Sequence, residues 1–321
     1  LRDHDFRRPG LALGVERRAG KPDEEAYEQY RYSPGAALRE LSPSGLSLEP
    51  AADDLGVSRW EERQLDARAQ VSHEALRAAQ RRVFFHSNVA DLAPGTTLQI
   101  AGHPRKELLS TGVLVTRFVM QGEVASSDPF LFEAEAVLRD ARYRPAQRTP
   151  KPVIHGAQSA VVVGPAGAEI HTDEHGRVRV QFHWDREGKH NEGSSCWMRV
   201  SQGWAGSGFG MIAIPRVGQE VLVSFLEGDP DHPVVVGRLY NATARPPYDL
   251  PAHKTRSGWK SDSTPGSGGY NELMFEDAKG KELVRGQAER DLETVVKRNE
   301  ARSVGVDRRT SIGAVDESHV G

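Results

Sequence analysis

The chain of 321 residues has a single cysteine, Cys196, and no long hydrophobic run. One thiol excludes a disulfide within the chain and is typical of proteins made in a reducing compartment. No apolar stretch approaches the roughly 18 residues that a membrane-spanning helix needs, and the first residues do not resemble a secretory signal. We therefore expect synthesis in the cytoplasm, without a Sec-type leader or a membrane span in this segment.

A strong excess of charge of one sign is also missing. The 42 basic and 45 acidic residues give a net charge of -3, which does not favour nucleic acid or an anionic membrane as partner. Aromatic residues make up only 7%, whereas 32 glycines and 19 prolines are present. This composition predicts a turn-rich, mainly β protein with two or three domains.

The end of the chain repeats with a period of eight residues. A β-branched residue returns at every eighth position, and from the second copy onward a glycine follows it. The branched residues are Val296, Val304, Ile312 and Val320, and the glycines are Gly305, Gly313 and Gly321. Eight residues overshoot two helical turns by about 80°, whereas in an extended chain they all fall on one face. The repeat therefore predicts a β-solenoid-like array.

Such an array is too poor in apolar side chains to be stable as one chain. One apolar residue per octad contributes about 1.5–3 kcal/mol on burial, while ordering the backbone costs about 1–2 kcal/mol per residue. Further copies of the chain would supply the missing inner wall, with the four branched residues forming the core of a needle. The alternative, a charged disordered tail, does not account for the strict recurrence.

The first half of the chain contains one predicted helix and several strands. We expect irregular connections over residues 1–58, a surface helix over 59–82, and a small barrel from 83 to 138. Its strands are predicted at residues 97–100, 112–119 and 130–137. The sequence Arg-Thr-Pro-Lys-Pro at 148–152 marks a domain boundary.

Residues 153–240 carry the densest strand signal. In the segment 177–184, Val178, Val180, Phe182 and Trp184 alternate with polar residues, which predicts that these four form the core of a small barrel. Further strands are expected at 196–200, 211–214, 221–225 and 234–239. Five strands in so short a stretch are typical of an OB-type barrel. A Gly/Ser loop is expected over 257–270 and a turn at 278–280.

Several segments, in order, resemble the VgrG spike proteins of bacterial type VI secretion systems. They are Asp-Glu-His-Gly-Arg-Val-Arg-Val-Gln-Phe-His-Trp-Asp at 173–185, Trp-Met-Arg-Val at 197–200, Ala-Ile-Pro-Arg-Val-Gly-Gln-Glu-Val at 213–221, Gly-Asp-Pro-Asp at 228–231, Asn-Glu-Leu at 271–273, and the octads. The resemblance is close from residue 150 onward and looser before about residue 75.

The resemblance implies a baseplate-hub-like base over 1–147 and an OB-fold neck over 148–245. A connector would follow at 246–290, with an intertwined trimeric β-prism from 291 to 321. It also implies a homotrimer seated on a hexameric tube, capped by a PAAR-type tip protein and carrying effectors, with baseplate contacts and transient contact with a target membrane. Such a spike is made in the bacterial cytoplasm and secreted without a signal peptide. We expect the present chain to be a piece of a longer one, cut at both ends.

Four features could suggest chemistry, but each has a simpler interpretation. His171, Asp173, His175, His183 and Asp185 could suggest a metal site, yet the turn at Gly176 breaks the spacing. Ser194, Ser195 and Cys196 lack a nucleophile elbow. The glycines of 203–210 lack the ending of a phosphate-binding loop. Between 160 and 240, seven basic residues face ten acidic ones, which argues against nucleic acid.

We therefore predict a structural spike without catalysis, metal or cofactor in this segment. Two alternatives remain open at this point. One is a tail spike of a contractile phage. The other is a hydrolase, in which the His/Asp-rich hairpin or an effector domain carried beyond residue 321 acts on cell-wall or lipid substrates.

Overall fold

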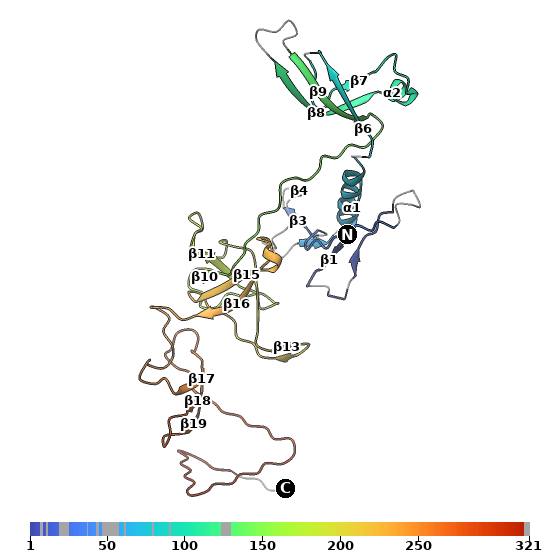
Figure 1. The fold of residues 1–321 in the computed structure, drawn as a ribbon. Coiled ribbons are helices and arrows are strands. Elements are labelled where there is room, and N and C mark those ends of the chain that lie inside the picture. The colour runs from blue at the N-terminus through green and yellow to red at the C-terminus, as the bar shows by residue number, and fades with distance from the viewer. Residues whose placement is uncertain are drawn as a thin grey trace. The chain divides into compact units, whose positions relative to one another are not determined.

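The computed structural model describes residues 1–6, 9–10, 12–18, 26–36, 38–42, 45–46, 58–60, 62–78, 80–89, 91–122 and 130–317. The chain divides into two compact units, Leu1–Asn241 and Ala242–Gly321 (Figure 1). Within the described residues no helix is both long enough and apolar enough to cross a membrane.

The first part of unit 1 combines short strands with one helix. Strands β1 (Arg2–Asp3) and β2 (Leu13–Gly14) pair with each other, and β3 (Leu38–Ser42) pairs with β4 (Gly45–Leu46) and β5 (Ser58–Trp60). The irregular structure expected before residue 58 is therefore wrong in part. Helix α1 (Glu62–Arg77) confirms the predicted helix, and its Leu65 is buried together with Ala36.

A four-stranded antiparallel sheet follows in the order β6-β9-β8-β7. Its strands are β6 (Arg82–Ser87), β7 (Thr97–Leu98), β8 (Val113–Gly122) and β9 (Phe130–Leu138). The three strands predicted here are confirmed as β7, β8 and β9. Helix α2 (Lys106–Thr111), which the sequence did not predict, buries Leu108 against Val113, Ala136 and Leu138.

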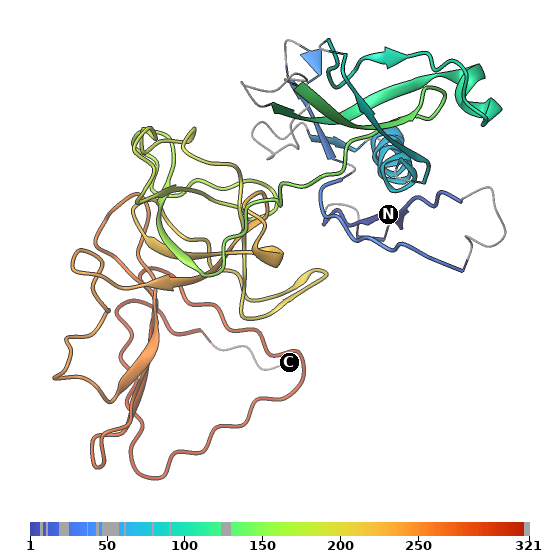
Figure 2. The ribbon, with the colours of Figure 1, turned by 45° about the horizontal axis from the view of Figure 1, so that its top comes forward.

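The second part of unit 1 is a five-stranded sheet of order β11-β10-β15-β16-β12 (Figure 2). Its strands are β10 (Gln158–Val163), β11 (Arg179–Phe182), β12 (Arg199–Val200), β15 (Glu220–Phe225) and β16 (Pro233–Leu239). Antiparallel pairing joins β11, β10, β15 and β16, and β12 runs parallel to β16. A short 3-10 turn, η2 (Leu226–Gly228), connects β15 to the loop before β16.

The number of strands predicted for this sheet is right, but one member is wrong. Residues 211–214 form no strand. They follow a separate hairpin, in which β13 (Ala205–Gly206) pairs with β14 (Phe209–Gly210). The fifth strand is instead β10, whose Val162 is fully buried between its neighbours β11 and β15.

Unit 2 contains a three-stranded antiparallel sheet of order β17-β18-β19. The strands are β17 (Arg256–Lys260), β18 (Glu272–Glu276) and β19 (Leu283–Gln287). The loop predicted over 257–270 is too long, since β17 extends to residue 260. The turn predicted at 278–280 lies between β18 and β19. In this turn Lys281 N donates a hydrogen bond to Ala278 O at 2.8 Å.

Candidate self-association surface

The three-stranded sheet of unit 2 has one face that the unit itself covers. Gly258, Met274 and Arg285 lie opposite one another across the strands, and Met274 is buried. A Cβ on Gly258 would lie 2.4 Å from the carbonyl oxygen of Leu273 and 2.8 Å from the Tyr248 hydroxyl. Only glycine allows this close approach, so Tyr248 packs directly on the strand, and its hydroxyl lies 3.3 Å from Glu272 Oε1.

Ionic contacts at both ends of β18 stabilise this face. Arg256 Nε lies 3.0 Å from Glu276 Oε2, and Arg285 Nε lies 4.0 Å from Glu272 Oε2. The pKa of Glu276 is lowered, first by the hydrogen bond from the Thr255 hydroxyl and further by Arg256. These contacts hold the charged side chains in fixed positions along the sheet.

The opposite face of the same sheet is apolar and uncovered within unit 2. Side chains alternate along a strand, so residues one register position away point to this second face. Trp259 pairs with Leu273, and Val284 pairs with Phe275. Trp259, Leu273 and Val284 are all exposed. A contiguous apolar surface of this kind is typical of a site that another protein covers.

The octads appear in the backbone as a bend that recurs every eight residues. Bends lie at 289–290, 297–298, 305–306 and 313–314, and the residues between them belong to no helix or strand. Each bend starts directly after an octad position, or, at the first one, after Ala288. The period read from the sequence is therefore a real period of the chain conformation.

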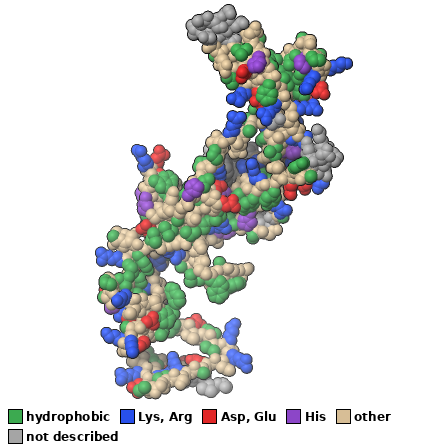
Figure 3. All heavy atoms as spheres, in the orientation of Figure 1, with side chains coloured by type: hydrophobic (Ala, Val, Ile, Leu, Met, Phe, Trp, Pro, Cys, Tyr) green, Lys and Arg blue, Asp and Glu red, His purple; other side chains and the backbone are tan. Residues whose placement is uncertain are grey.

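The octad residues are also less exposed than the apolar residues between them. Val296, Val304 and Ile312 are 48%, 49% and 48% exposed, whereas Val306 is 91% exposed and Val315 is 71% exposed. The three described octad side chains thus have the same environment, in which about half of each is shielded. Charged side chains of both signs lie along the C-terminal part of the chain, at the bottom of the view in Figure 3.

The glycines of the repeat have no reason for being glycine within a single chain. A Cβ on Gly305 or Gly313 would meet no atom within 4 Å, and neither residue has a positive φ. A requirement for glycine would therefore come from another chain that approaches the backbone closely. Val320 and Gly321, the last predicted members of the repeat, lie outside the described residues.

The predicted barrel core is correct for its first members and wrong for Trp184. Val178 and Val180 are fully buried, and Phe182 packs against the same cluster. Trp184 is 67% exposed, because β11 ends at Phe182 and a turn follows in which Asp185 N donates to Phe182 O. Its indole stacks on Phe182 at 5.2 Å between ring centroids and donates to Gln158 Oε1.

Asp173 and His171, two of the candidate metal ligands, have other partners. Asp173 accepts hydrogen bonds from the backbone and the guanidinium of Arg177, and His171 packs on Trp197 at 4.8 Å. Burial acts to raise the pKa of Asp173, but the Arg177 hydrogen bonds outweigh it and the pKa is lowered. The described residues contain no group of three or more potential metal ligands.

Cys196 and the glycine-rich segment are likewise accounted for by packing. Cys196 lies partly buried against the barrel core. The Ser195 hydroxyl, next to it, donates to Cys196 O and accepts from Val180 N. Residues 203–210 form the β13–β14 hairpin.

Three family models match consecutive parts of the chain. Residues 1–126 match the phage tail baseplate hub, and residues 160–240 match the type VI secretion system/phage-baseplate injector OB domain. Residues 257–321 match the C-terminal trimerisation domain of bacteriophage T4 gp5. Hub, OB and trimerisation matches thus follow one another in the order that the sequence predicted.

Three type VI secretion system spike proteins of Pseudomonas aeruginosa are similar to nearly the whole chain. VgrG4b is 42% identical over 98% of this chain, and VgrG1b is 40% identical over 97% of it. VgrG1a is 40% identical over 95% of it. The chain belongs to the VgrG family.

Membership confirms the predicted family and fold class. The fold is mainly β, with a hub-like part, an OB-type sheet and a C-terminal part that matches a trimerisation domain. The chain spans only 38%, 40% and 45% of the lengths of VgrG4b, VgrG1b and VgrG1a. These VgrG relatives are spike proteins by name.

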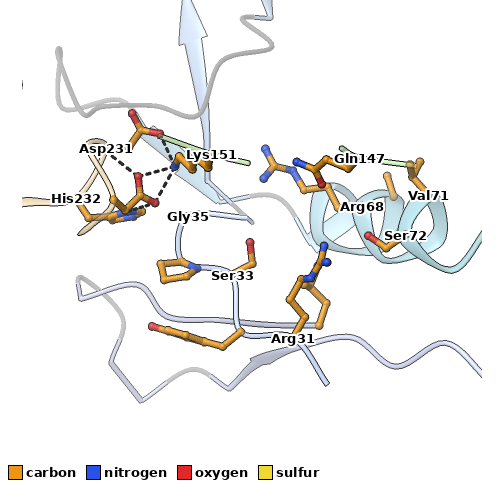
Figure 4. A pocket seen from close by; sticks show the side chains of 15 residues that line it. Arg31, Ser33, Gly35, Arg68, Val71, Ser72, Gln147, Lys151, Asp231 and His232 are labelled. Carbon is orange, nitrogen blue, oxygen red and sulfur yellow. Dashed lines mark hydrogen bonds and ion pairs between the residues drawn. The ribbon is translucent and has the colours of Figure 1, made fainter. Parts of the chain in front are cut away.

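The VgrG motif Gly-Asp-Pro-Asp at 228–231 lies on a cavity inside unit 1 (Figure 4). Lys151 Nζ lies 2.7 Å from both Asp229 Oδ2 and Asp231 Oδ2, and His232 Nδ1 lies 3.0 Å from Asp229 Oδ2. Burial acts to raise the pKa of Asp229, but the hydrogen bonds it accepts, first the one from Lys151, outweigh burial. The pKa of Asp229 is therefore lowered. His232 also packs on the turn at Gly35. The motif therefore ties its loop to the linker and to this turn, which is a structural role.

Proposed function

We propose that three copies of this chain assemble into the spike of a type VI secretion system, with residues 291–321 as the start of an intertwined needle. The observation that carries the proposal is the octad segment, whose apolar side chains recur every eight residues and are about half exposed in a single copy. Three copies packed around an axis would cover these side chains.

The energetics support assembly rather than a free arm. Each octad orders eight residues at about 1–2 kcal/mol each, against one apolar side chain worth about 1.5–3 kcal/mol. Backbone hydrogen bonds and apolar contacts between chains would offset this difference. The unused apolar face with Trp259, Leu273 and Val284 adds a further surface for association directly before the octads.

The work of such a spike is mechanical. Chains that wind around one another cannot separate under axial force unless their contacts along the whole needle break together. We propose that the chain itself is not catalytic, because Asp173 is engaged by Arg177, His171 packs on Trp197, and Cys196 packs against the barrel core. This proposal concerns residues 1–321.

The partners follow from the same proposal. They are a hexameric tube below the base, a PAAR-type protein at the tip, baseplate proteins and effectors, with transient contact with a target membrane and no nucleic acid. The spike would leave the cytoplasm through the secretion machinery. We place the base at 1–147, the OB neck at 148–245, the connector at 246–290 and the needle from 291.

Light scattering coupled to size exclusion tests the central point. The expected mass is three times the 35.3 kDa of one chain, and it should persist on dilution. A mass of one chain at micromolar concentration would refute the proposal.

A further inference from the structure

The β13–β14 hairpin is a projection that the OB sheet does not need. It leaves the sheet after β12 and extends away from it in both ribbon views (Figures 1 and 2). Neither of its strands joins the five-stranded sheet, since they pair only with each other. A feature outside the core and outside the sheet calls for a function of its own.

Glycines fix the shape of this hairpin. Gly208 and Gly210 have φ angles of 77° and 138°, which disfavour other residues. The ring of Phe209 lies flat on Gly206, where a Cβ would come within 2.3 Å of it. Phe209 also meets Trp204 edge to face at 5.9 Å, and Met211 N donates to Trp204 O at 2.9 Å. The two aromatic rings are therefore held in place before any partner binds.

The fixed side chains are apolar and exposed. Trp204 is 65% exposed and Phe209 is 61% exposed, and Met211 and Ile212 beside them are exposed as well. Residues 200–215 contain no charged side chain, although charged residues make up 27% of the whole chain. Preorganised aromatic residues on an uncharged surface are typical of the anchors of a protein interface.

We propose that this hairpin is an arm that packs Trp204 and Phe209 against the OB neck of a neighbouring copy of the same chain. The inference rests on the proposed trimer. The trimerisation match begins at residue 257 and the neck match ends at residue 240. A link of this length reaches at most about 60 Å at about 3.5 Å per residue, so trimerisation gives the necks an effective concentration in the millimolar range.

The symmetry of a three-membered ring sets what the arm must bind. In such a ring each copy uses two different patches, one for each neighbour, so an arm that lies away from the axis packs on a surface other than its own. The neck exposes apolar side chains of its own at Trp184, Val236 and Tyr240. Val236 is the extra residue of a β-bulge in β16, because Gly237 and Val235 on either side of it pair with consecutive residues of β15. These side chains are suitable acceptors for an aromatic arm.

Site-specific photo-crosslinking tests the arm in the whole chain. With Phe209→p-benzoylphenylalanine, ultraviolet light should join two copies, and peptide mapping should find the partner site within residues 160–240. The matched control is Lys189→p-benzoylphenylalanine, an exposed position on another loop of the neck, which should give at most weak crosslinks. If the trimer forms but Phe209 reacts only within its own chain or not at all, the inference is overturned.

A second variant tests the energetic role. Trp204→Ser with Phe209→Ser should raise the concentration at which half the trimer dissociates at least tenfold, because a single interface anchor contributes that much. Circular dichroism checks that each copy still folds. An unchanged midpoint would contradict the inference while leaving the trimer in place. A parent chain that is monomeric would instead refute the proposed function, so the two failures are distinguishable.

Discussion

Placing a carboxylate at an octad position should weaken the trimer far more than placing it next to that position. Val304 is 49% exposed in one copy, so about half of its side chain is left for a partner to bury. Full burial of a valine contributes about 1.5–3 kcal/mol, which leaves about 1 kcal/mol per chain and about 3 kcal/mol per layer of three. Val304→Asp removes this contribution.

The new carboxylates add a larger cost. If three of them stand about 6 Å apart near the axis, each pair repels by about 3 kcal/mol at an effective dielectric of about 20. The carboxylates will take up protons or move outward to reduce this repulsion. The apolar loss alone corresponds to about a 100-fold change in an equilibrium constant, and that is the minimum we expect.

The assay is sedimentation across a range of concentrations, together with thermal melting. Val304→Asp should shift the dissociation midpoint of the trimer upward by at least one decade, because that concentration varies as the square root of a trimer's dissociation constant, and it should lower the melting temperature. Val306→Asp is the matched control, because Val306 is 91% exposed, lies two residues away and belongs to no octad position. If both variants sediment and melt like the parent, the octad reasoning is wrong.

Three further predictions concern single residues. Gly188→Ala should lower the free energy of unfolding of the neck by about 1–3 kcal/mol, because a Cβ there would lie 2.0 Å from Gln181 Oε1. Urea titration measures this loss, and adding Gln181→Ala should recover part of it. Hydrogen bonds, first the one from Gln70, lower the pKa of Glu74 from 4.5 to about 2. The contribution of Glu74 to stability should therefore be present above pH 4.5 and fade toward pH 2. In Glu74→Gln, the melting temperature should depend less on pH between these two values. Gly258→Ala should destabilise unit 2, visible as faster proteolysis there, and an equally resistant variant would contradict the close packing of Tyr248.

Much of the fold could be predicted because its signals are local. The helix at 62–77 lacks proline and glycine. In strands such as β15, buried and half-buried residues alternate along the sequence, so a short stretch is enough to recognise the strand. The strand β10 was missed because it reads as a plain apolar run, Ala-Val-Val-Val, without alternation. It is buried between two strands, and this arrangement arises only when distant segments pair.

The eight-residue period follows from the order of the amino acids alone, since a repeat is a property of one chain and imposes the same bend at each copy. The residues of β11 that share a face follow from it as well. The end of β11 at Phe182 depends on tertiary contacts, and it leaves Trp184 on the surface while polar Gln181 is buried. Alternation tells which side chains point the same way, but the segment that covers a face, and the residue at which a strand ends, depend on parts of the chain that lie far away in sequence.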